Sequence, residues 1–403
     1  MNIGIVTTWF ERGAAYVSRQ YKEVLEKEHN VFIYARSGEE YAIGNPDWDG
    51  DQVTWGKKIN SPFAGTVLQK STFKKWIDTN SIEVVLFNEQ QWFQPVVWCK
   101  EWQIKTIAYI DYYTERTIPL FEVYDMLICN TKRHFSAFDW HKGAIYLPWG
   151  TNIDVFKPKV NGENLVNEEF VTFFHSCGMN IDRKGTRILI QAFADAKKAK
   201  KLIIHTQKEI NDKDLVPLIE ELVAAGRLEI INKTVSAPGL YFLGDVYIYP
   251  TILEGIGLTI AEAISSGLGT VVPDNGPMNE FVINEYNGNL IKLDKCYARH
   301  DGYYWPVCTS SVQDLVVIIN DLAGDKNKVL TMKKNARSSA EANLSFEKNA
   351  QHLTALIGNL DFTPISKKLK SSVDKFDNAG FKKFNKLYMI FPSFFNLIWK
   401  KVL

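Results

Sequence analysis

Short runs of apolar, mostly β-branched residues alternate along the chain with amphipathic stretches of helical period. In the first half, apolar runs lie at residues 3–7, 31–35, 83–87, 106–110 and 126–130, and an amphipathic stretch spans 16–28. Runs that stay apolar at successive positions predict strands buried on both faces, which is typical of a parallel sheet. The first half therefore predicts a Rossmann-like α/β domain.

The second half repeats this pattern. Apolar runs lie at residues 170–176, 201–206, 228–232, 245–250 and 269–274, with helical patterns at 186–198 and 214–226. Residues 147–164 carry proline, glycine and asparagine with little periodicity, and they predict a linker between the halves. We therefore predict an α/β protein with two Rossmann-like, doubly wound parallel-sheet domains that face a central cleft, followed by a C-terminal helical tail.

The expected domains are residues 1–155, residues 156–345, and a third region of C-terminal helices and a basic, aromatic tail at 346–403. A chain of 403 residues exceeds the usual size of a single core, which favours two domains. Its five cysteines form no CxxC pair and predict neither a disulfide framework nor a zinc cluster. Because we find no signal peptide and no long apolar segment, we expect a cytoplasmic protein.

The charge of the chain is concentrated in the tail. Residues 365–403 hold nine lysines and two aspartates, a net charge of +7, so residues 1–364 carry −6 of the total of +1. The body therefore lacks the basic charge of a nucleic-acid-binding protein. Aromatic residues at helical spacing beside lysines predict that the tail binds an anionic membrane surface, on the inner face of the plasma membrane. The alternative is a helix that packs back on the N-terminal domain.

The stretch EGIGLTIAEA, residues 254–263, follows a predicted strand and opens a predicted helix. Gly255 and Gly257 allow a tight turn and the close approach of a ligand. The free amides of the helix that begins near Leu258 favour phosphate. Glu254 and Glu262 can accept hydrogen bonds from sugar hydroxyls. The alternative is that both glutamates are surface residues and that the glycines only shape a turn.

A second basic turn follows the predicted strand at 170–176. Arg183, Lys184 and Gly185 stand where the next helix opens. Cations at a helix N-terminus oppose the helix dipole, and a bound diphosphate would compensate for this. Because both turns follow strands of one parallel sheet, we expect them at the same edge. A solvated basic pair is the alternative.

These two turns and the segment LPWGTNIDVFKP, residues 147–158, resemble retaining nucleotide-sugar glycosyltransferases of the GT-B fold, family four (group 1). The resemblance covers roughly residues 1–360. It implies an N-terminal acceptor domain and a C-terminal donor domain, in which Glu254 contacts the donor sugar, Glu262 binds the ribose and Lys184 is the family's lysine. The backbone amides implied to hold the diphosphate are those of Gly255, Ile256, Gly257 and Leu258.

The sequence departs from the family pattern at two places. The family's arginine five or six residues before the lysine is replaced by Gly178 and Met179, so we expect Arg183 to substitute and Asn180 to add a neutral contact.

The family's histidine at the end of an N-terminal strand is replaced by Ile110 and Asp111, and Asp111 is the candidate for a polar contact near the reacting carbon. Gly13 corresponds to a family glycine near the donor phosphate, with an ordinary helix-entry turn as the alternative.

The implied function is a retaining hexosyltransferase that moves a sugar from a nucleotide-diphosphate sugar to a glycan or lipid-linked acceptor in surface polysaccharide biosynthesis. No cofactor and no metal are expected. The segment DWDGD at 47–51 follows Gly44, Asn45 and Pro46, which predicts a solvent loop rather than the end of a buried strand. The alternatives are a GT-B phosphorylase or epimerase, and a non-catalytic sugar-binding protein. A dinucleotide oxidoreductase is disfavoured, because no GxGxxG follows the first strand.

Overall fold

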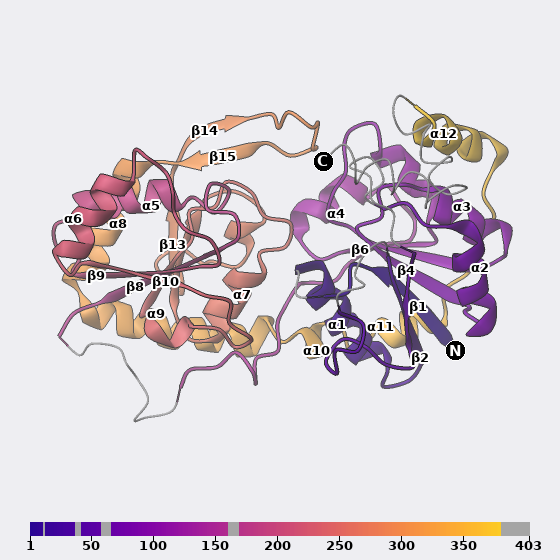
Figure 1. Ribbon diagram of the computed structural model, residues 1–403, viewed down its shortest axis with the longest axis horizontal. Coiled ribbons are helices and arrows are strands. Elements are labelled where there is room, and N and C mark those ends of the chain that lie inside the picture. The colour runs from indigo at the N-terminus through magenta and orange to yellow at the C-terminus, as the bar shows by residue number, and fades with distance from the viewer. Residues whose placement is uncertain (11–12, 37–41, 58–65, 160–168, 380–403) are drawn as a thin grey trace. The chain divides into compact units, whose positions relative to one another are not determined.

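The computed structural model describes residues 1–10, 13–36, 42–57, 66–159 and 169–379. It divides into two compact units. The first contains Met1–Leu147 and Ala350–Leu403, and the second contains Pro148–Asn349. In each unit a parallel sheet is layered with helices (Figure 1).

The first unit holds a seven-stranded parallel sheet of order β3-β2-β1-β4-β5-β6-β7. Its strands are β1 (Asn2–Thr7), β2 (Asn30–Ala35), β3 (Val53–Trp55), β4 (Val84–Asn88), β5 (Lys105–Tyr109), β6 (Met126–Cys129) and β7 (Ala144–Tyr146). All five predicted strands are confirmed. The sequence missed β3 and β7, because three residues are too few to show an apolar run.

The helices of the first unit are α1 (Gly13–Leu25), α2 (Lys70–Thr79), α3 (Gln94–Glu101), α4 (Lys132–Phe138), α11 (Leu353–Gly358), α12 (Lys367–Asp377) and the 3₁₀ turn η2 (Ile118–Val123). Helix α1 packs with α11, and α3 packs with α12. The strand order reverses at β1, which pairs with both β2 and β4 and makes the sheet doubly wound, as predicted.

The second unit holds a six-stranded parallel sheet of order β10-β9-β8-β11-β12-β13. Its strands are β8 (Thr172–Gly178), β9 (Lys201–Thr206), β10 (Leu228–Asn232), β11 (Val246–Ile248), β12 (Gly269–Pro273) and β13 (Gly288–Ile291). The five predicted strands are again confirmed. The order reverses between β8 and β11, which pair directly. Ligands bind at such a switch point in doubly wound sheets.

Helices cover the second sheet on both faces. They are α5 (Thr186–Asp195), α6 (Val216–Ala224), α7 (Leu258–Ser265), α8 (Val312–Gly324), α9 (Lys326–Asn343) and α10 (Phe346–Asn349). Helices α7 and α9 pack together, and α5 packs with α6 and α8 (Figure 1). A hairpin, β14 (Leu293–Tyr297) with β15 (Val307–Ser310), projects from this unit. The sequence did not predict it, because β14 is almost entirely exposed and carries no apolar pattern.

The C-terminal segment belongs to the first unit, whereas the sequence predicted a separate region at 346–403. A buried ion pair anchors it. Lys100 Nζ lies 2.5 Å from Asp125 Oδ1, and these side chains are 1% and 0% exposed. The backbone of Thr363 accepts a hydrogen bond from Lys100 at 3.0 Å and donates one to Asp125 at 2.7 Å. Burial lowers the pKa of Lys100, and the hydrogen bond from Lys100 to Asp125 opposes that shift.

Helix α12, which follows Thr363 in the chain, also packs on the first unit. Gln94 donates to Asp374 at 2.9 Å, and the rings of Phe93 and Phe376 meet edge to face with centroids 6.1 Å apart. Residues 365–379 of the basic tail therefore pack on the first unit. The aromatic positions predicted to meet a membrane fall within 380–403, outside the described residues.

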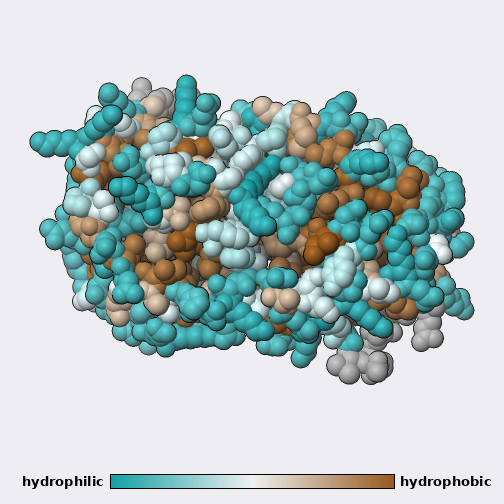
Figure 2. Space-filling model, turned by 180° about the vertical axis from the view of Figure 1, so that it is seen from behind, coloured by the Kyte–Doolittle hydropathy of each residue, from teal (hydrophilic) through white to brown (hydrophobic). Residues whose placement is uncertain are grey.

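Within the described ranges, no helix combines the length and apolar character needed to span a membrane. Hydrophilic side chains cover most of the face drawn in Figure 2, and apolar side chains appear there in small separate groups.

Removing one partner of the Lys100–Asp125 pair should destabilise the protein strongly. In Asp125→Ala the ammonium of Lys100 stays buried without a counter-charge, and we expect a loss of about 3–5 kcal/mol of unfolding free energy. Asp321→Ala, which removes an exposed partner of Lys328, is the matched control and should cost less than about 1 kcal/mol. Urea unfolding of both variants measures the difference. Equal losses would contradict the role of the anchor.

Candidate functional site

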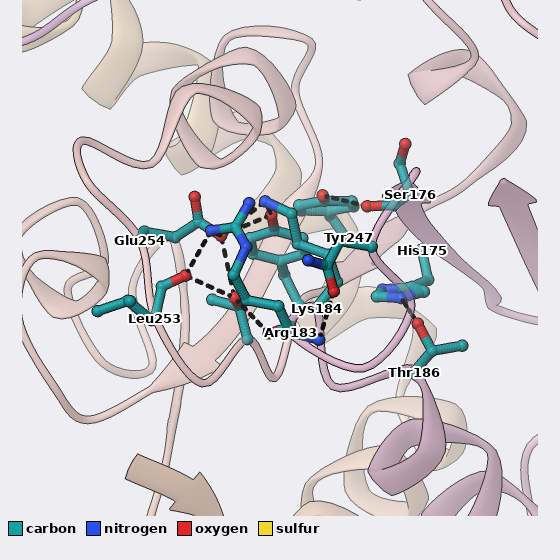
Figure 3. Close-up of polar contacts among 11 residues, drawn as sticks. His175, Ser176, Arg183, Lys184, Thr186, Tyr247, Leu253 and Glu254 are labelled. Carbon is teal, nitrogen blue, oxygen red and sulfur yellow. Dashed lines mark hydrogen bonds and ion pairs between the residues drawn. The ribbon is translucent and has the colours of Figure 1, made fainter. Parts of the chain in front are cut away.

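The two turns predicted to bind a diphosphate meet at the carboxyl ends of β8 and β11. These strands are neighbours, so the loop after each one emerges at the same edge. The backbone of Ile252 donates to Arg183 O at 2.9 Å, and the Arg183 guanidinium donates to Leu253 O at 2.9 Å. The loops are thus joined by hydrogen bonds in both directions (Figure 3).

Glu254 is the centre of this junction. It is 7% exposed, and its Oε1 lies 2.7 Å from Lys184 Nζ and 3.4 Å from an Arg183 nitrogen. The hydroxyls of Tyr249 and Thr251 each lie 2.9 Å from the same oxygen. Among the described residues, all polar contacts of Glu254 involve Oε1. Figure 3 shows the second oxygen pointing away from this group.

The charges at the junction stabilise one another. Burial by itself would raise the pKa of Glu254, but Lys184 and Arg183 outweigh it and hold that pKa below its ordinary value. Burial lowers the pKa of Lys184, and the charge of Glu254 opposes the shift. Lys184 also donates to the hydroxyl of Tyr249. The cluster therefore keeps a carboxylate and an ammonium together in a site with little water.

Each turn uses a glycine at the residue before its helix. Gly185 precedes α5 and Gly257 precedes α7, and both have φ of +71°. A Cβ on Gly185 would lie 2.0 Å from Pro250 O, so only glycine allows the two loops to meet this closely.

The first backbone hydrogen bonds of α7 come from Ile260 and Ala261, which both donate to Gly257 O. Within the described part of the chain, the amides of Ile256, Gly257 and Leu258 have no protein acceptor. Orphan donors at the positive end of a helix dipole have the chemistry that suits an anion.

Glu262, one turn further along α7, is held by a residue that the sequence analysis did not single out. The hydroxyl of Tyr241 donates to Glu262 Oε2 at 2.6 Å. Burial raises the pKa of Glu262, and this hydrogen bond opposes the rise. Tyr241 and Tyr249 were both missed as site residues. Tyr249 lies in a predicted strand, DVYIYP, where an aromatic residue normally indicates core packing.

His175 connects the strands and the helix that carry the two loops. It is buried, and burial lowers its pKa to about 4. Ile248 O lies 2.8 Å from Nδ1 and can only accept, so Nδ1 carries the proton. Nε2 then accepts from the Thr186 hydroxyl at 2.9 Å. This neutral histidine ties β8 to β11 and to the first residue of α5 (Figure 3).

Met179 stands at a position of the missing family arginine, and Asn180 and Arg183 are the residues expected to compensate for it. Met179 is 58% exposed, and Asn180 is exposed too. Asn180 Oδ1 accepts from the backbone of Arg183 at 3.0 Å, so it shapes the turn that presents the two cations. Arg183 and Lys184 both contact Glu254 Oε1 at the junction, and the substitution of Arg183 for the family arginine stays a prediction.

Two candidates lie in the first unit. Gly13 is the exposed first residue of α1, and Asp111 is half-buried just after β5. Arg12, the residue before Gly13, is outside the described residues. The segment Asp47–Asp51 forms turns, as predicted, and Asp49 accepts from the backbone of Gly44 at 2.6 Å and from the Trp55 indole at 2.7 Å.

Comparison with known proteins gives a family match for the segment that holds the junction. Residues 171–299 match the family described as "Glycosyl transferases group 1". That segment contains both turns, Glu254 and Glu262. No curated protein matches the chain.

Solved structures resemble the chain over most of its length. HepE from Anabaena, in complex with UDP and glucose, aligns with a TM-score of 0.67 and 17% identity over 89% of this chain and 100% of that one. Sucrose-phosphate synthase from Thermosynechococcus elongatus aligns with a TM-score of 0.65 and 16% identity, covering 89% and 99%. The pneumococcal O-GlcNAc transferase GtfA, in complex with UDP and GlcNAc, aligns with a TM-score of 0.66 and 13% identity, covering 89% and 99%.

The protein has the GT-B fold. The fold prediction is therefore confirmed, and the matched family supports glycosyl transfer as the general activity. The comparisons do not assign roles to individual side chains, so Glu254, Glu262 and the other site residues remain predictions.

The glycine at the junction should be irreplaceable. Gly226 has φ of +69°, and a Cβ added there would meet nothing within 4 Å, so Gly226→Ala should cost only the backbone strain of about 1–2 kcal/mol. Gly185→Ala adds the clash with Pro250 O and should cost roughly 2–5 kcal/mol. Urea unfolding without ligand compares the two. If both variants lose equal stability, Gly185 is not required for the approach of the loops.

Proposed function

We propose that this protein is a retaining glycosyltransferase that moves a sugar from a nucleotide-diphosphate sugar to a glycan or lipid-linked acceptor, without a metal. The observation that carries the proposal is the meeting of Lys184 and Glu254 beside the unpaired amides of residues 256–258. A site that only recognised a neutral sugar would not need a cationic junction next to an anion-binding helix end.

The donor would use each part of the junction. Its diphosphate would accept hydrogen bonds from the amides of residues 256–258 and from Lys184 and Arg183. The second oxygen of Glu254 would accept from a hydroxyl of the transferred sugar, and Glu262 would accept from the ribose. Because Lys184 contacts Glu254 at 2.7 Å, the same ammonium would link the sugar-binding carboxylate to the diphosphate.

The chemistry follows from neutralising the leaving group. As the bond from the anomeric carbon to the diphosphate breaks, negative charge grows on the phosphate, where the cations and amides stabilise it. The acceptor hydroxyl would attack the oxocarbenium-like carbon from the face that the diphosphate leaves, so configuration is retained. The departing phosphate would take the proton of that hydroxyl, and no protein nucleophile is needed.

The similar structures support a nucleotide-sugar donor and a role in surface polysaccharide biosynthesis. The HepE and GtfA complexes contain UDP with glucose or GlcNAc. WaaB, another similar structure, is a lipopolysaccharide outer core galactosyltransferase, with a TM-score of 0.62 and 12% identity. We infer that this chain uses a donor of the same class.

The two glutamates should separate affinity from turnover. Glu262→Ala removes the ribose acceptor and should weaken binding of the nucleoside diphosphate about 10- to 100-fold. Glu254→Ala should lower turnover about 100-fold or more, with a smaller loss of nucleotide affinity. Glu229→Ala, an exposed glutamate near the amino-terminal end of β10, is the control and should leave both unchanged.

A thermal-shift panel of UDP-, GDP- and ADP-sugars first finds the donor, and the variants are then measured with it. Mass spectrometry identifies the product. Release of a sugar phosphate would indicate a phosphorylase, and an isomerised donor would indicate an epimerase. Donor binding without turnover, even with glycan acceptors, would indicate a sugar-binding protein. Unchanged activity in both glutamate variants would refute the site.

We also propose that the basic tail, residues 365–403, binds an anionic membrane surface, which suits a lipid-linked acceptor. Helix α12 exposes Lys367, Lys368 and Lys375, while Lys370 pairs with Glu101 at 2.5 Å. Deleting residues 380–403 leaves α12 on its packing site and should reduce sedimentation with phosphatidylglycerol vesicles. Phosphatidylcholine vesicles are the control. Unchanged sedimentation of both the 380–403 and the 365–403 deletions would remove this proposal.

A further inference from the structure

Three tyrosines form a packed row behind the two glutamates. Tyr247 and Tyr249 stack with ring centroids 5.3 Å apart and an interplanar angle of 21°. Tyr241, from the 3₁₀ turn Tyr241–Leu243, meets Tyr247 edge to face at 5.7 Å. Phe174 packs against both Tyr241 and Tyr247, at 5.9 and 6.1 Å. All three tyrosine rings are buried, so the position of each hydroxyl is fixed by packing.

The two ends of this row meet the two glutamates. Tyr249 donates to Glu254 Oε1 at 2.9 Å, and Tyr241 donates to Glu262 Oε2 at 2.6 Å. The middle hydroxyl, that of Tyr247, contacts neither glutamate and lies 3.5 Å from the backbone oxygen of Ser176. The row of tyrosines therefore links the two carboxylates through aromatic packing, although Glu254 lies in the loop before α7 and Glu262 lies within α7.

We propose that Tyr241 and Tyr249 are positioning residues, each of which fixes one oxygen of a donor-site glutamate so that the other oxygen faces a hydroxyl of the nucleotide sugar. This inference rests on the proposed function, because it assumes that Glu262 binds the ribose and Glu254 the transferred sugar. It adds to that function a physical reason for the orientation of each carboxylate.

The chemistry of tyrosine suits this task. A buried tyrosine hydroxyl needs a partner, and a carboxylate oxygen is the strongest acceptor available. Burial raises the pKa of both tyrosines well above 10, so each remains a neutral donor throughout the physiological range. A phenylalanine at position 241 would remove the hydrogen bond that holds Glu262, and one at position 249 would remove one of the four contacts that hold Glu254 Oε1.

The test removes one hydroxyl at a time and keeps each ring. Tyr241→Phe should weaken binding of the nucleoside diphosphate roughly three- to tenfold and leave turnover at saturating donor nearly unchanged. Tyr249→Phe should lower turnover by roughly the same factor with little change in nucleotide affinity. Tyr247→Phe is the matched control and should change neither. UDP, GDP, ADP and dTDP are the calorimetric probes, and the one that binds the wild type most tightly is used throughout.

The pH dependence distinguishes positioning from a general loss of packing. The Tyr241 hydroxyl lowers the pKa of Glu262, so Tyr241→Phe should raise it. Ionised Glu262 is a stronger acceptor for a ribose hydroxyl than its protonated form, and Lys184, which also favours the ionised form, is the same in both proteins. Nucleotide affinity should therefore begin to fall at a higher pH in Tyr241→Phe than in the wild type. A purely structural role would lower affinity equally at all pH values and would also lower the melting temperature.

The outcomes separate this inference from the proposed function. If Glu262→Ala weakens nucleotide binding but Tyr241→Phe behaves like Tyr247→Phe, the positioning role is wrong and the site stands. If none of the four diphosphates binds the wild type, both proposals are overturned. Equal effects of all three phenylalanine variants would also overturn the positioning role.

Discussion

The contact of Lys184 with Glu254 is the interaction that holds together the two loops at the carboxyl ends of β8 and β11. It joins two loops that are seventy residues apart in the chain, and it holds opposite charges in a nearly buried place. A buried pair of this kind is tolerated only when hydrogen bonds satisfy the remaining polar groups. Tyr249 and Thr251 supply them at Glu254 Oε1.

The surrounding structure makes this contact possible. Pairing of β8 with β11 brings the loops to one edge, and the lack of a side chain on Gly185 lets the second loop approach through Pro250. Neutral His175 holds the strands and the start of α5 in register without adding a charge behind the site. In the first unit, the Lys100–Asp125 pair has a structural role instead, because both side chains form hydrogen bonds with the backbone of Thr363.

Most of the strands and both turns of the site could be predicted from the sequence. Ten strands appear as apolar runs, and most of them are buried, because a strand covered on both faces excludes polar residues. The turns at Arg183–Lys184 and Glu254–Leu258 could be predicted to share an edge, since each follows a strand of one parallel sheet. The short strands β3 and β7 and the exposed hairpin carry no such pattern. They form because of neighbours that the local sequence does not reveal.

Fold class and the positions of the two turns therefore follow from the sequence, because burial and helix entry select residue types locally. The groups that hold Glu254 and Glu262 follow instead from long-range packing. Tyr241 lies 21 residues before Glu262, and its hydroxyl reaches the carboxylate through the packing of Phe174 and Tyr247. Likewise, the return of residues 350–379 to the first unit depends on long-range contacts with Lys100 and Asp125, which leave no periodic signal in the chain.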